Sequence, residues 1–197
     1  MTEPRRLQSV AKVVRLPRTR RLSWAWVLLE YAHQLVLALW IGGLGAAGLL
    51  AGPTIFAAVV EPLEAANASL DLTLKVSFIG AGAGGFLLLT TLLMHLMELR
   101  GLRATLLQTA FLLGMTLAAV VVYVGVAPPL RDLLQQNPEL LLSQRPADLF
   151  ARYVALHHAM DLLVLAQIAA GALLLLLGVR RWYRYVAPGA THRAIDA

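Results

Sequence analysis

The sequence predicts an all-α membrane protein built as a bundle of four transmembrane helices. Two observations carry this prediction: an unusually apolar composition and a set of long segments without charge. Hydrophobic residues make up 59% of the 197 residues, charged residues only 14%, and the mean hydropathy is +0.70. Soluble domains carry about 25% charged residues, so the composition is that of a membrane protein.

The charge-free segments give the number of spans. No charged residue occurs from 76 to 97 or from 104 to 130, and only Glu30 interrupts the segment from 22 to 60. Each exceeds the roughly 20 residues that cross the hydrocarbon core. A fourth segment, 153–179, carries one acid, Asp161. We therefore expect a transmembrane domain over 24–179, between a basic leader (1–23) and a basic, aromatic tail (180–197).

Basic residues predict the orientation. Of the 17 Lys and Arg residues, most fall in the leader, the 99–103 loop and the tail. The positive-inside rule places these segments in the cytoplasm, which suggests a bacterial inner membrane with both termini inside. Aromatic and basic side chains flank the spans and are expected to contact lipid headgroups: Trp24, Trp26, Arg180, Arg181, Trp182 and Tyr183. The basic leader adjoins a membrane helix and lacks interleaved aromatics, so we expect no nucleic-acid partner.

Proline and glycine mark the connections on the other side. Gly52-Pro53 is expected to kink or end the first span. Between Pro128-Pro129 and Pro138, the segment LRDLLQQN places three leucines on one face. This spacing predicts a short helix lying on the membrane surface.

Small residues predict where helices pack closely. Gly48 and Gly52, and likewise Gly80 and Gly84, are spaced by one helical turn. In lipid such faces allow close backbone approach, so we expect them to join the first and second helices. A homodimer or a partner helix is the alternative use of these faces.

Ionisable residues within the spans are the candidate functional residues, because they are costly to bury in hydrocarbon. One layer contains Glu30 and His33 with His95, and the other contains His157 and Asp161. Both Glu30–His33 and His157–Asp161 have a helical spacing that puts them on one face. We expect the second pair to lie within the hydrocarbon and to be hydrogen-bonded.

A metal or a haem is conceivable but poorly supported by geometry. Met94, His95 and Met97 include ligand types that Cu(I) accepts, but His95 is rotated about 100° away from the two methionines on a helix. A b-type haem would need His33 and His95 at one depth, and counting along the helices separates them by about 9 Å. We expect no cofactor, with a copper ion and haem b as the alternatives.

Several short motifs together resemble a known family. They are His33 with Trp40 and Gly42-Gly43, then Pro53-x-x-Phe56, Ala127-Pro128 with Arg131, and Tyr153-x-x-Leu156-His157. In this order they are similar to the motifs of the transmembrane protein 205-like family. This resemblance implies a four-helix membrane domain whose function is not established. The segment HQLVLALWIGG is also similar to the first helix of copper-resistance D membrane proteins, which implies a link to copper.

The sequence contains no hydrolase, metalloprotease or phosphate-loop motif, so we expect no enzyme activity. The favoured interpretation is a non-enzymatic accessory or scaffold subunit that contacts lipids and other membrane proteins, or forms a homo-oligomer. Two alternatives stay open. One is a small transporter or copper-stress protein with Glu30, His33, His95, His157 and Asp161 along a polar path, and the other is a b-type haem subunit.

Overall fold

The computed structural model describes residues 24–96, 102–141 and 146–186, with residues 102, 103 and 182–186 described as backbone only. The described part is helical and contains four rods long and apolar enough to cross a membrane. The predicted fold class, an all-α bundle of four membrane helices, is confirmed.

Each rod is a single or a composite helix. The first rod comprises α1 (Trp24–Gly45), the π-helix η1 (Ala46–Ala51) and α2 (Gly52–Ala58). The second is α3 (Pro62–Leu96). The third comprises α4 (Leu102–Val120), the π-helix η2 (Val121–Val126) and α5 (Ala127–Gln136), followed by a 3-10 turn, η3 (Pro138–Leu141). The fourth is α6 (Ala147–Val186), which continues past residue 179, where the membrane domain is predicted to end.

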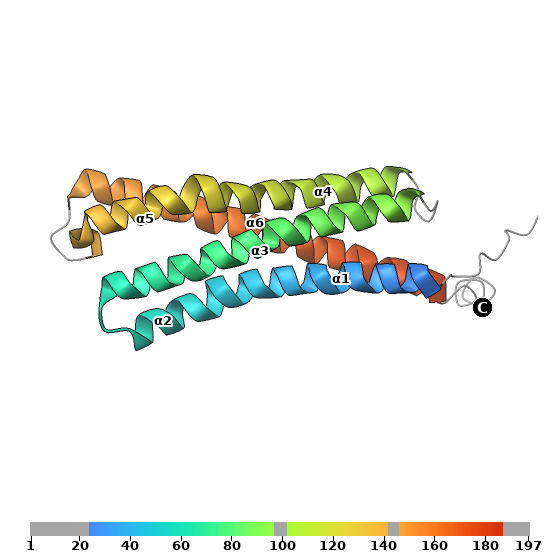
Figure 1. Ribbon diagram of the computed structural model, residues 1–197, viewed down its shortest axis with the longest axis horizontal. Helices are drawn as coiled ribbons and strands as arrows, with labels where there is room; N and C mark the ends of the chain where they lie inside the picture. The colour runs from blue at the N-terminus through green and yellow to red at the C-terminus, as the bar shows by residue number, and fades with distance from the viewer. Residues whose placement is uncertain (1–23, 97–101, 142–145, 187–197) are drawn as a thin grey trace, which may run out of the picture.

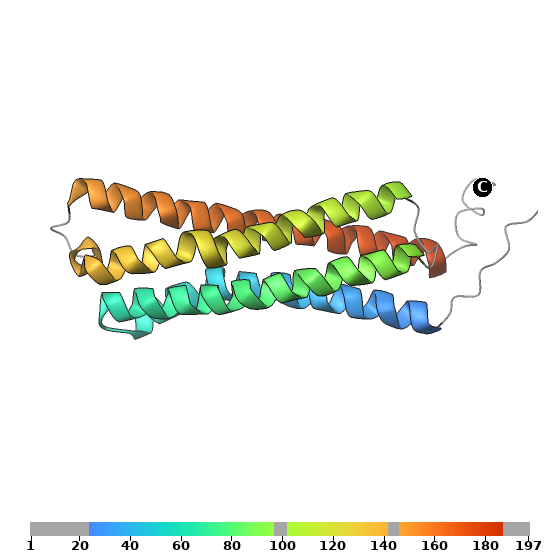
Figure 2. The same ribbon diagram turned by 45° about the horizontal axis from the view of Figure 1, so that its top comes forward.

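The rods pack side by side in the cyclic order α1, α3, α4, α6 (Figures 1 and 2). Each of these helices contacts its two neighbours in this order, so α1 lies diagonally opposite α4. We call the end where α1 begins and α6 ends the tail end, and the opposite end, where α2 and α5 end, the far end.

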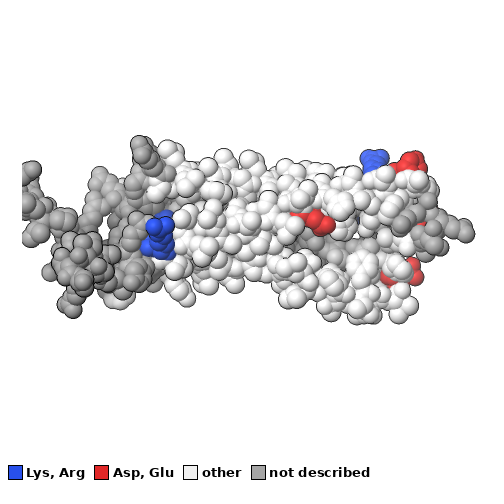
Figure 3. All heavy atoms as spheres, turned by 180° about the vertical axis from the view of Figure 1, so that it is seen from behind, with Lys and Arg blue, Asp and Glu red and all other residues white. Residues whose placement is uncertain are grey.

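Apolar side chains fill the middle of the bundle and also cover its outside, as expected when the solvent is lipid. The central core is formed by Leu37, Trp40, Leu44, Leu87, Leu112, Met115, Ala119 and Leu174. A second cluster near the far end contains Leu70, Val122, Val126, Ala127, Leu130 and Met160. Seen from behind, a broad surface without charge separates the basic atoms near the tail end from the acidic atoms beyond (Figure 3).

Glycines allow close helix contacts in the bundle, but only some of the four predicted glycines make them with the predicted helix. A Cβ at Gly80 would lie 2.8 Å from Trp40 Cε2 on α1, and one at Gly84 would lie 3.0 Å from Thr116 Cβ on α4. Gly52 meets Ser69 on α3 more loosely, at 3.6 Å, and Gly48 has open space around it. Gly84 thus contacts the third rod rather than the first.

The predicted surface helix is replaced by a continuation of the third rod. The segment after Pro128-Pro129 forms most of α5, and Leu130, Leu133 and Leu134 are buried against the bundle. The prediction was wrong because amphipathic spacing does not say whether membrane or protein covers the apolar face. Two prolines in the first turn fit a helix start, where the missing N–H groups have no helical acceptor to lose.

The rods are longer than a bilayer core. Their apolar spans contain 33 to 35 residues, which at ~1.5 Å per residue is about 50 Å, against ~30 Å of hydrocarbon. Two exposed charged residues lie at similar distances from the tail end: Lys75 is roughly 30 Å along α3 from Leu96, and Asp161 is roughly 30 Å along α6 from Arg181. We take this level as the far boundary of the hydrocarbon; it crosses the first rod near Gly45.

Candidate functional site

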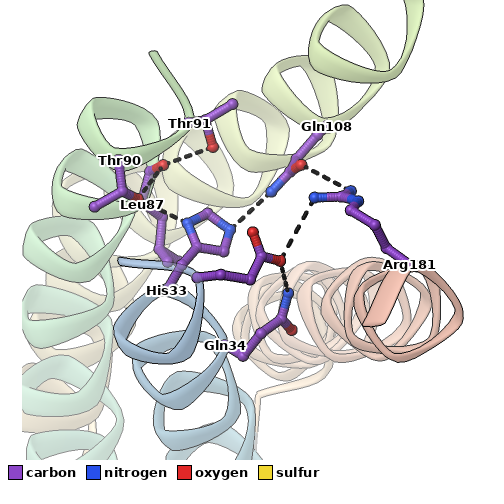
Figure 4. A network of polar contacts seen from close by, with 8 residues as sticks. His33, Gln34, Leu87, Thr90, Thr91, Gln108 and Arg181 are labelled. Atoms are coloured by element: carbon purple, nitrogen blue, oxygen red, sulfur yellow. Dashed lines mark hydrogen bonds and ion pairs between the residues drawn. The ribbon is translucent and has the colours of Figure 1, made fainter. Parts of the chain in front are cut away.

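A layer of buried polar side chains joins all four rods near the tail end (Figure 4). His33 and Glu30 on α1, Thr90 on α3 and Gln108 on α4 are each at least nine-tenths buried. Arg181 on α6 reaches into the same layer with 20% of its side chain exposed. We call these five residues, together with Gln34, the polar layer.

The hydrogen bonds of the polar layer form a chain in which each side chain donates to the next, from Arg181 to Thr90. The Arg181 guanidinium can only donate, and its Nη2 lies 3.4 Å from Gln108 Oε1. The amide oxygen of Gln108 therefore faces Arg181, and its nitrogen donates to His33 Nε2 at 2.7 Å. His33 Nδ1 lies 2.7 Å from Thr90 Oγ1, and that hydroxyl donates to the Leu87 carbonyl at 3.0 Å. Since Nε2 accepts and Nδ1 donates, His33 is the neutral Nδ1–H tautomer.

Glu30 is held by charge and hydrogen bonding from two helices. Its Oε1 accepts from Arg181 Nη1 at 3.5 Å and from Gln34 Nε2 at 3.1 Å, while the side chain is only 1% exposed. Gly178 on α6 makes room for this amide, because a Cβ there would lie 2.6 Å from Gln34 Cδ. A buried carboxylate needs such partners, since an isolated charge in hydrocarbon is strongly destabilising.

A crevice of about 150 Å³ reaches the polar layer from the side, between α4 and α6. Its lining includes Gln108 and Arg181, with Ala104, Leu107, Leu174 and Leu177 around them. The volume and the two polar side chains suffice for several water molecules. The polar layer therefore has an approach from the membrane edge at the tail end.

A second group of polar residues lies at the far end. His157 Nδ1 is 3.0 Å from Asp161 Oδ2, and the two side chains are 46% and 50% exposed. The predicted pairing is present, and both side chains lie on the outside of the bundle; whether the pair lies within the hydrocarbon stays a prediction. Asp71 on α3 pairs with Arg131 on α5 and with Lys75 at 3.7 Å.

The two polar groups are separated by the central core. Leu37 and Trp40 follow His33 on α1 in the direction of the far end. Both of these core residues are buried among leucines and Met115. The five ionisable candidates therefore do not form one continuous row.

Residues 35–139 match the family described as "Domain of unknown function (DUF4149)". The match covers more than half of the chain. The chain belongs to the DUF4149 family. Comparisons with curated proteins and with solved structures give no match.

The DUF4149 segment includes part of the polar layer. It runs from the middle of α1 through α3, α4 and α5, and so contains Thr90 and Gln108. Glu30 and His33 precede it, while Arg181 and the His157–Asp161 pair on α6 follow it. The first and last rods thus complete a site that the matched segment only begins.

The remaining histidine and methionine candidates of this DUF4149 protein are spread apart. Met94 is fully buried and His95 half-buried, with its Nδ1 lacking a hydrogen-bond partner. Met97 lies outside the described residues. Across the described ranges, no group of three or more His, Cys, Asp or Glu residues could hold a metal ion. Both ring nitrogens of His33 are engaged by Gln108 and Thr90, so a haem iron would have to displace one of them.

The six residues predicted to contact lipid headgroups do not all face outward. Trp24 and Arg180 are exposed, as headgroup contacts require. Trp26 is buried in the bundle and cannot present its ring to lipid, because two residues along a helix turn the side chain by about 200° from Trp24. Arg181 is turned inward to Glu30. The side chains of Trp182 and Tyr183 lie outside the described residues.

Sequence reasoning missed Arg181 and Gly178 as parts of the site. Arg181 follows the charge-free segment of the fourth span at the end where Glu30 lies in the first. A lone acid in one span and an arginine at the same depth in another is the signal that could have paired them. Gly178 has no such signal, because only the packed structure brings it to Gln34.

Proposed function

We propose that the protein is a non-enzymatic accessory subunit that binds other membrane proteins through an apolar arm at the far end. The arm comprises residues 46–60, which form η1 and α2 and the start of the following turn. The observation that carries the proposal is the exposure of large apolar side chains where the other rods carry charge. Leu49, Leu50 and Phe56 are half or more exposed, and Val60 is 99% exposed.

With the far boundary of the hydrocarbon taken at the level of Lys75 and Asp161, the arm lies beyond it. It begins at Ala46, next to the point near Gly45 where that level crosses the first rod, and its last helix, α2, lies beside the start of α3 (Figure 1). At corresponding levels α3 carries Glu64 and Asp71, α5 carries Arg131 and Asp132, and α6 carries Asp148 and Arg152. The first rod has no charged residue from 31 to 60.

The partner's chemistry follows from this contrast. α2 buries none of its seven residues within the bundle, so its apolar surface would face headgroups or water. Contiguous apolar surface in that position is typical of a protein-binding site. An uncharged helix of another membrane protein, extending past the bilayer in the same way, would cover it without burying a charge.

The polar layer supports a scaffold role. Its donors and acceptors are matched across four helices, so it fixes the depth of each rod relative to the others. A bundle held in one register at the tail end presents the arm at a constant height. We further propose that the tail end is cytoplasmic and the membrane a bacterial inner membrane, because the basic residues gather in the leader, the 99–103 loop and the tail.

Site-specific photo-crosslinking in cells tests this function. Benzoylphenylalanine replaces Phe56 in one variant and Phe86 in the control, because Phe86 on α3 is also exposed but lies within the hydrocarbon. We expect a crosslinked protein adduct of a different chain from position 56 and lipid adducts alone from position 86. A homodimer band, or lipid adducts alone at position 56, would contradict the proposal.

A second candidate, a small transporter or a copper-stress protein, is favoured by the crevice between α4 and α6. The crevice gives polar solutes a route to Gln108 and Arg181, and the resemblance of the first helix to copper-resistance D membrane proteins agrees with a copper function. The central core argues against a through path. Metal analysis and an optical spectrum of the purified protein test the copper form of this candidate. Stoichiometric copper would favour it, and the absence of copper would exclude it. A haem band would instead indicate the separate alternative, a b-type haem subunit.

A further inference from the structure

The first rod and α6 diverge at the far end and leave a shallow hollow between them. α1 packs against α6, but α2, which continues the first rod, packs against α3. Both views show α2 apart from the start of α6 (Figures 1 and 2). Phe56 on the arm lines one side of the hollow, and Tyr153 and His157 on α6 line the other. Its volume of about 30 Å³ has room for about two water molecules, so anything larger must lie across the hollow.

The α6 side of the hollow carries a carboxylate that faces outward among leucines. Asp161 lies one helical turn after His157, and its side chain is 50% exposed. Its exposed neighbours on α6 include Leu162 and Leu165. His157 Nδ1 contacts one carboxylate oxygen at 3.0 Å, whereas an ionised carboxylate can accept about four hydrogen bonds. A charge on such an apolar, membrane-facing surface is costly unless it is paired.

The Lys and Arg side chains that the structure describes at this end do not supply a positive charge to Asp161. Lys75 lies 3.7 Å from Asp71, and Arg131 pairs with the same carboxylate. Arg152 lies on α6, but roughly 14 Å along the helix from Asp161, which is farther than an arginine side chain reaches. A complementary positive charge must therefore come from another molecule.

We propose that a transmembrane helix of the partner protein lies across this hollow and places an arginine or lysine against the Asp161 carboxylate. The proposal rests on the proposed function, because the same helix covers the arm. The helix is uncharged where it meets Phe56, and its basic side chain lies nearer the tail end, at the level of Asp161. A lipid amine headgroup would neutralise the carboxylate but leave Phe56 uncovered, so the two sides of the hollow together favour a helix.

Photo-crosslinking from α6 tests this inference. Benzoylphenylalanine replaces Leu162, which is exposed beside Asp161, and the adduct is compared with the one from position 56. We expect both positions to capture the same protein. Mass spectrometry of the position 162 adduct should place the link within about two helical turns of an arginine or lysine in an apolar segment of that protein.

A charge variant provides the second part of the experiment. Asp161→Asn removes the charge but keeps an oxygen that can accept from His157, so the bundle should fold unchanged. It should lower the crosslinking yield at position 56 by about tenfold or more. Asp132→Asn is the matched control, because Asp132 is also an exposed acid at the far end but lies on α5 and does not line the hollow. Its yield should equal that of the wild type.

The outcomes separate this inference from the proposed function. A partner captured equally well by Asp161→Asn and Asp132→Asn would overturn the charge pairing and leave the arm as a binding site. Lipid adducts alone at position 162, a second copy of this chain there, or a linked segment without a basic residue would also overturn the charge pairing. The absence of any partner at position 56 would overturn both proposals. Asp161→Lys combined with an aspartate at the partner's basic position should restore the yield.

Discussion

Single residues in the polar layer are constrained by what their neighbours can donate. Arg181 fixes the orientation of the Gln108 amide, the amide fixes the acceptor nitrogen of His33, and His33 then donates to Thr90. A histidine with both nitrogens engaged in this way has one tautomer rather than a mixture. The arrangement makes His33 a structural link between α1, α3 and α4.

The tautomer of His33 can be measured directly. We predict a neutral imidazole with its proton on Nδ1, because Nε2 accepts from Gln108. Nitrogen-15 spectra of histidine-labelled protein in liposomes distinguish the three ring states, and His33→Gln identifies the signal. A doubly protonated ring, or a proton on Nε2, would show that the chain of hydrogen bonds runs differently.

Replacing one link tests how much the polar layer stabilises the bundle. Thr90→Val keeps the side-chain shape but removes the acceptor for His33, and should destabilise the protein by about 1 to 2 kcal/mol. Thr73→Val is the control, because that hydroxyl bonds the Ser69 carbonyl of its own helix and its loss should cost under about 0.5 kcal/mol. Thermal unfolding in one detergent compares them; equal midpoints would mean that the hydrogen bond to His33 contributes nothing measurable.

At this scale the sequence predicts which residues are polar and buried, but not all their partners. The layer of Glu30 and His33 is evident because ionisable residues are rare within spans. The outward direction of the His157–Asp161 pair is not evident, because helical spacing relates two residues to each other and not to the bundle. His95 is grouped with His33 by sequence, but its Nδ1 lacks a hydrogen-bond partner, whereas the ring nitrogens of His33 bond Gln108 and Thr90.

At the scale of elements, two rods change their helix type near the far boundary. η1 occupies 46–51 in the first rod and η2 occupies 121–126 in the third. Pro53 and Pro128-Pro129 follow them within a few residues. A proline cannot donate to the carbonyl four residues earlier, and a local i→i+5 turn re-pairs the backbone without breaking the rod. The sequence signals the irregularity, but whether a rod bends or continues depends on its packing.

Some helix contacts depend on glycines, because a side chain of the neighbouring helix occupies the space that a Cβ atom would take. Gly84→Ala would place a Cβ 3.0 Å from Thr116 Cβ, an atom fixed to the α4 backbone, so we predict a loss of about 1 to 3 kcal/mol. Gly82→Ala has open space and should leave stability unchanged or raise it by up to about 1 kcal/mol, since alanine favours helix. Unfolding midpoints of the two variants check this; a stable Gly84→Ala would show that α3 and α4 can move apart.

The whole molecule is a bundle whose two ends differ in character. Near the tail end a matched polar layer joins the four rods, and an apolar core fills the middle. Beyond the level of Lys75 and Asp161, three rods carry charged residues and the first remains apolar. The number of spans follows from sequence because it depends only on length and hydropathy. The length by which the rods exceed a bilayer core cannot be predicted in this way, because it depends on how far each helix continues past its apolar segment.

The height of this boundary on the bundle is testable because the sequence contains no cysteine. Single cysteines at His158, Leu165 and Leu173 all lie at exposed positions of α6, so only their depth in the membrane separates them. We predict that a membrane-impermeant maleimide labels position 158 rapidly and positions 165 and 173 slowly, since a thiol reacts as thiolate and hydrocarbon disfavours that charged form.

Val60→Cys should react from the same side as position 158, and cysteines at positions 10, 101 and 190 from the opposite side. Rapid labelling at Leu165 in sealed membranes would place the boundary nearer the tail end. The exposed leucines of the bundle would then face water instead of lipid, which is energetically prohibitive for so many side chains. A slow reaction at 158 would instead put the His157–Asp161 pair inside the hydrocarbon, where its half-exposed carboxylate would require a partner from another chain.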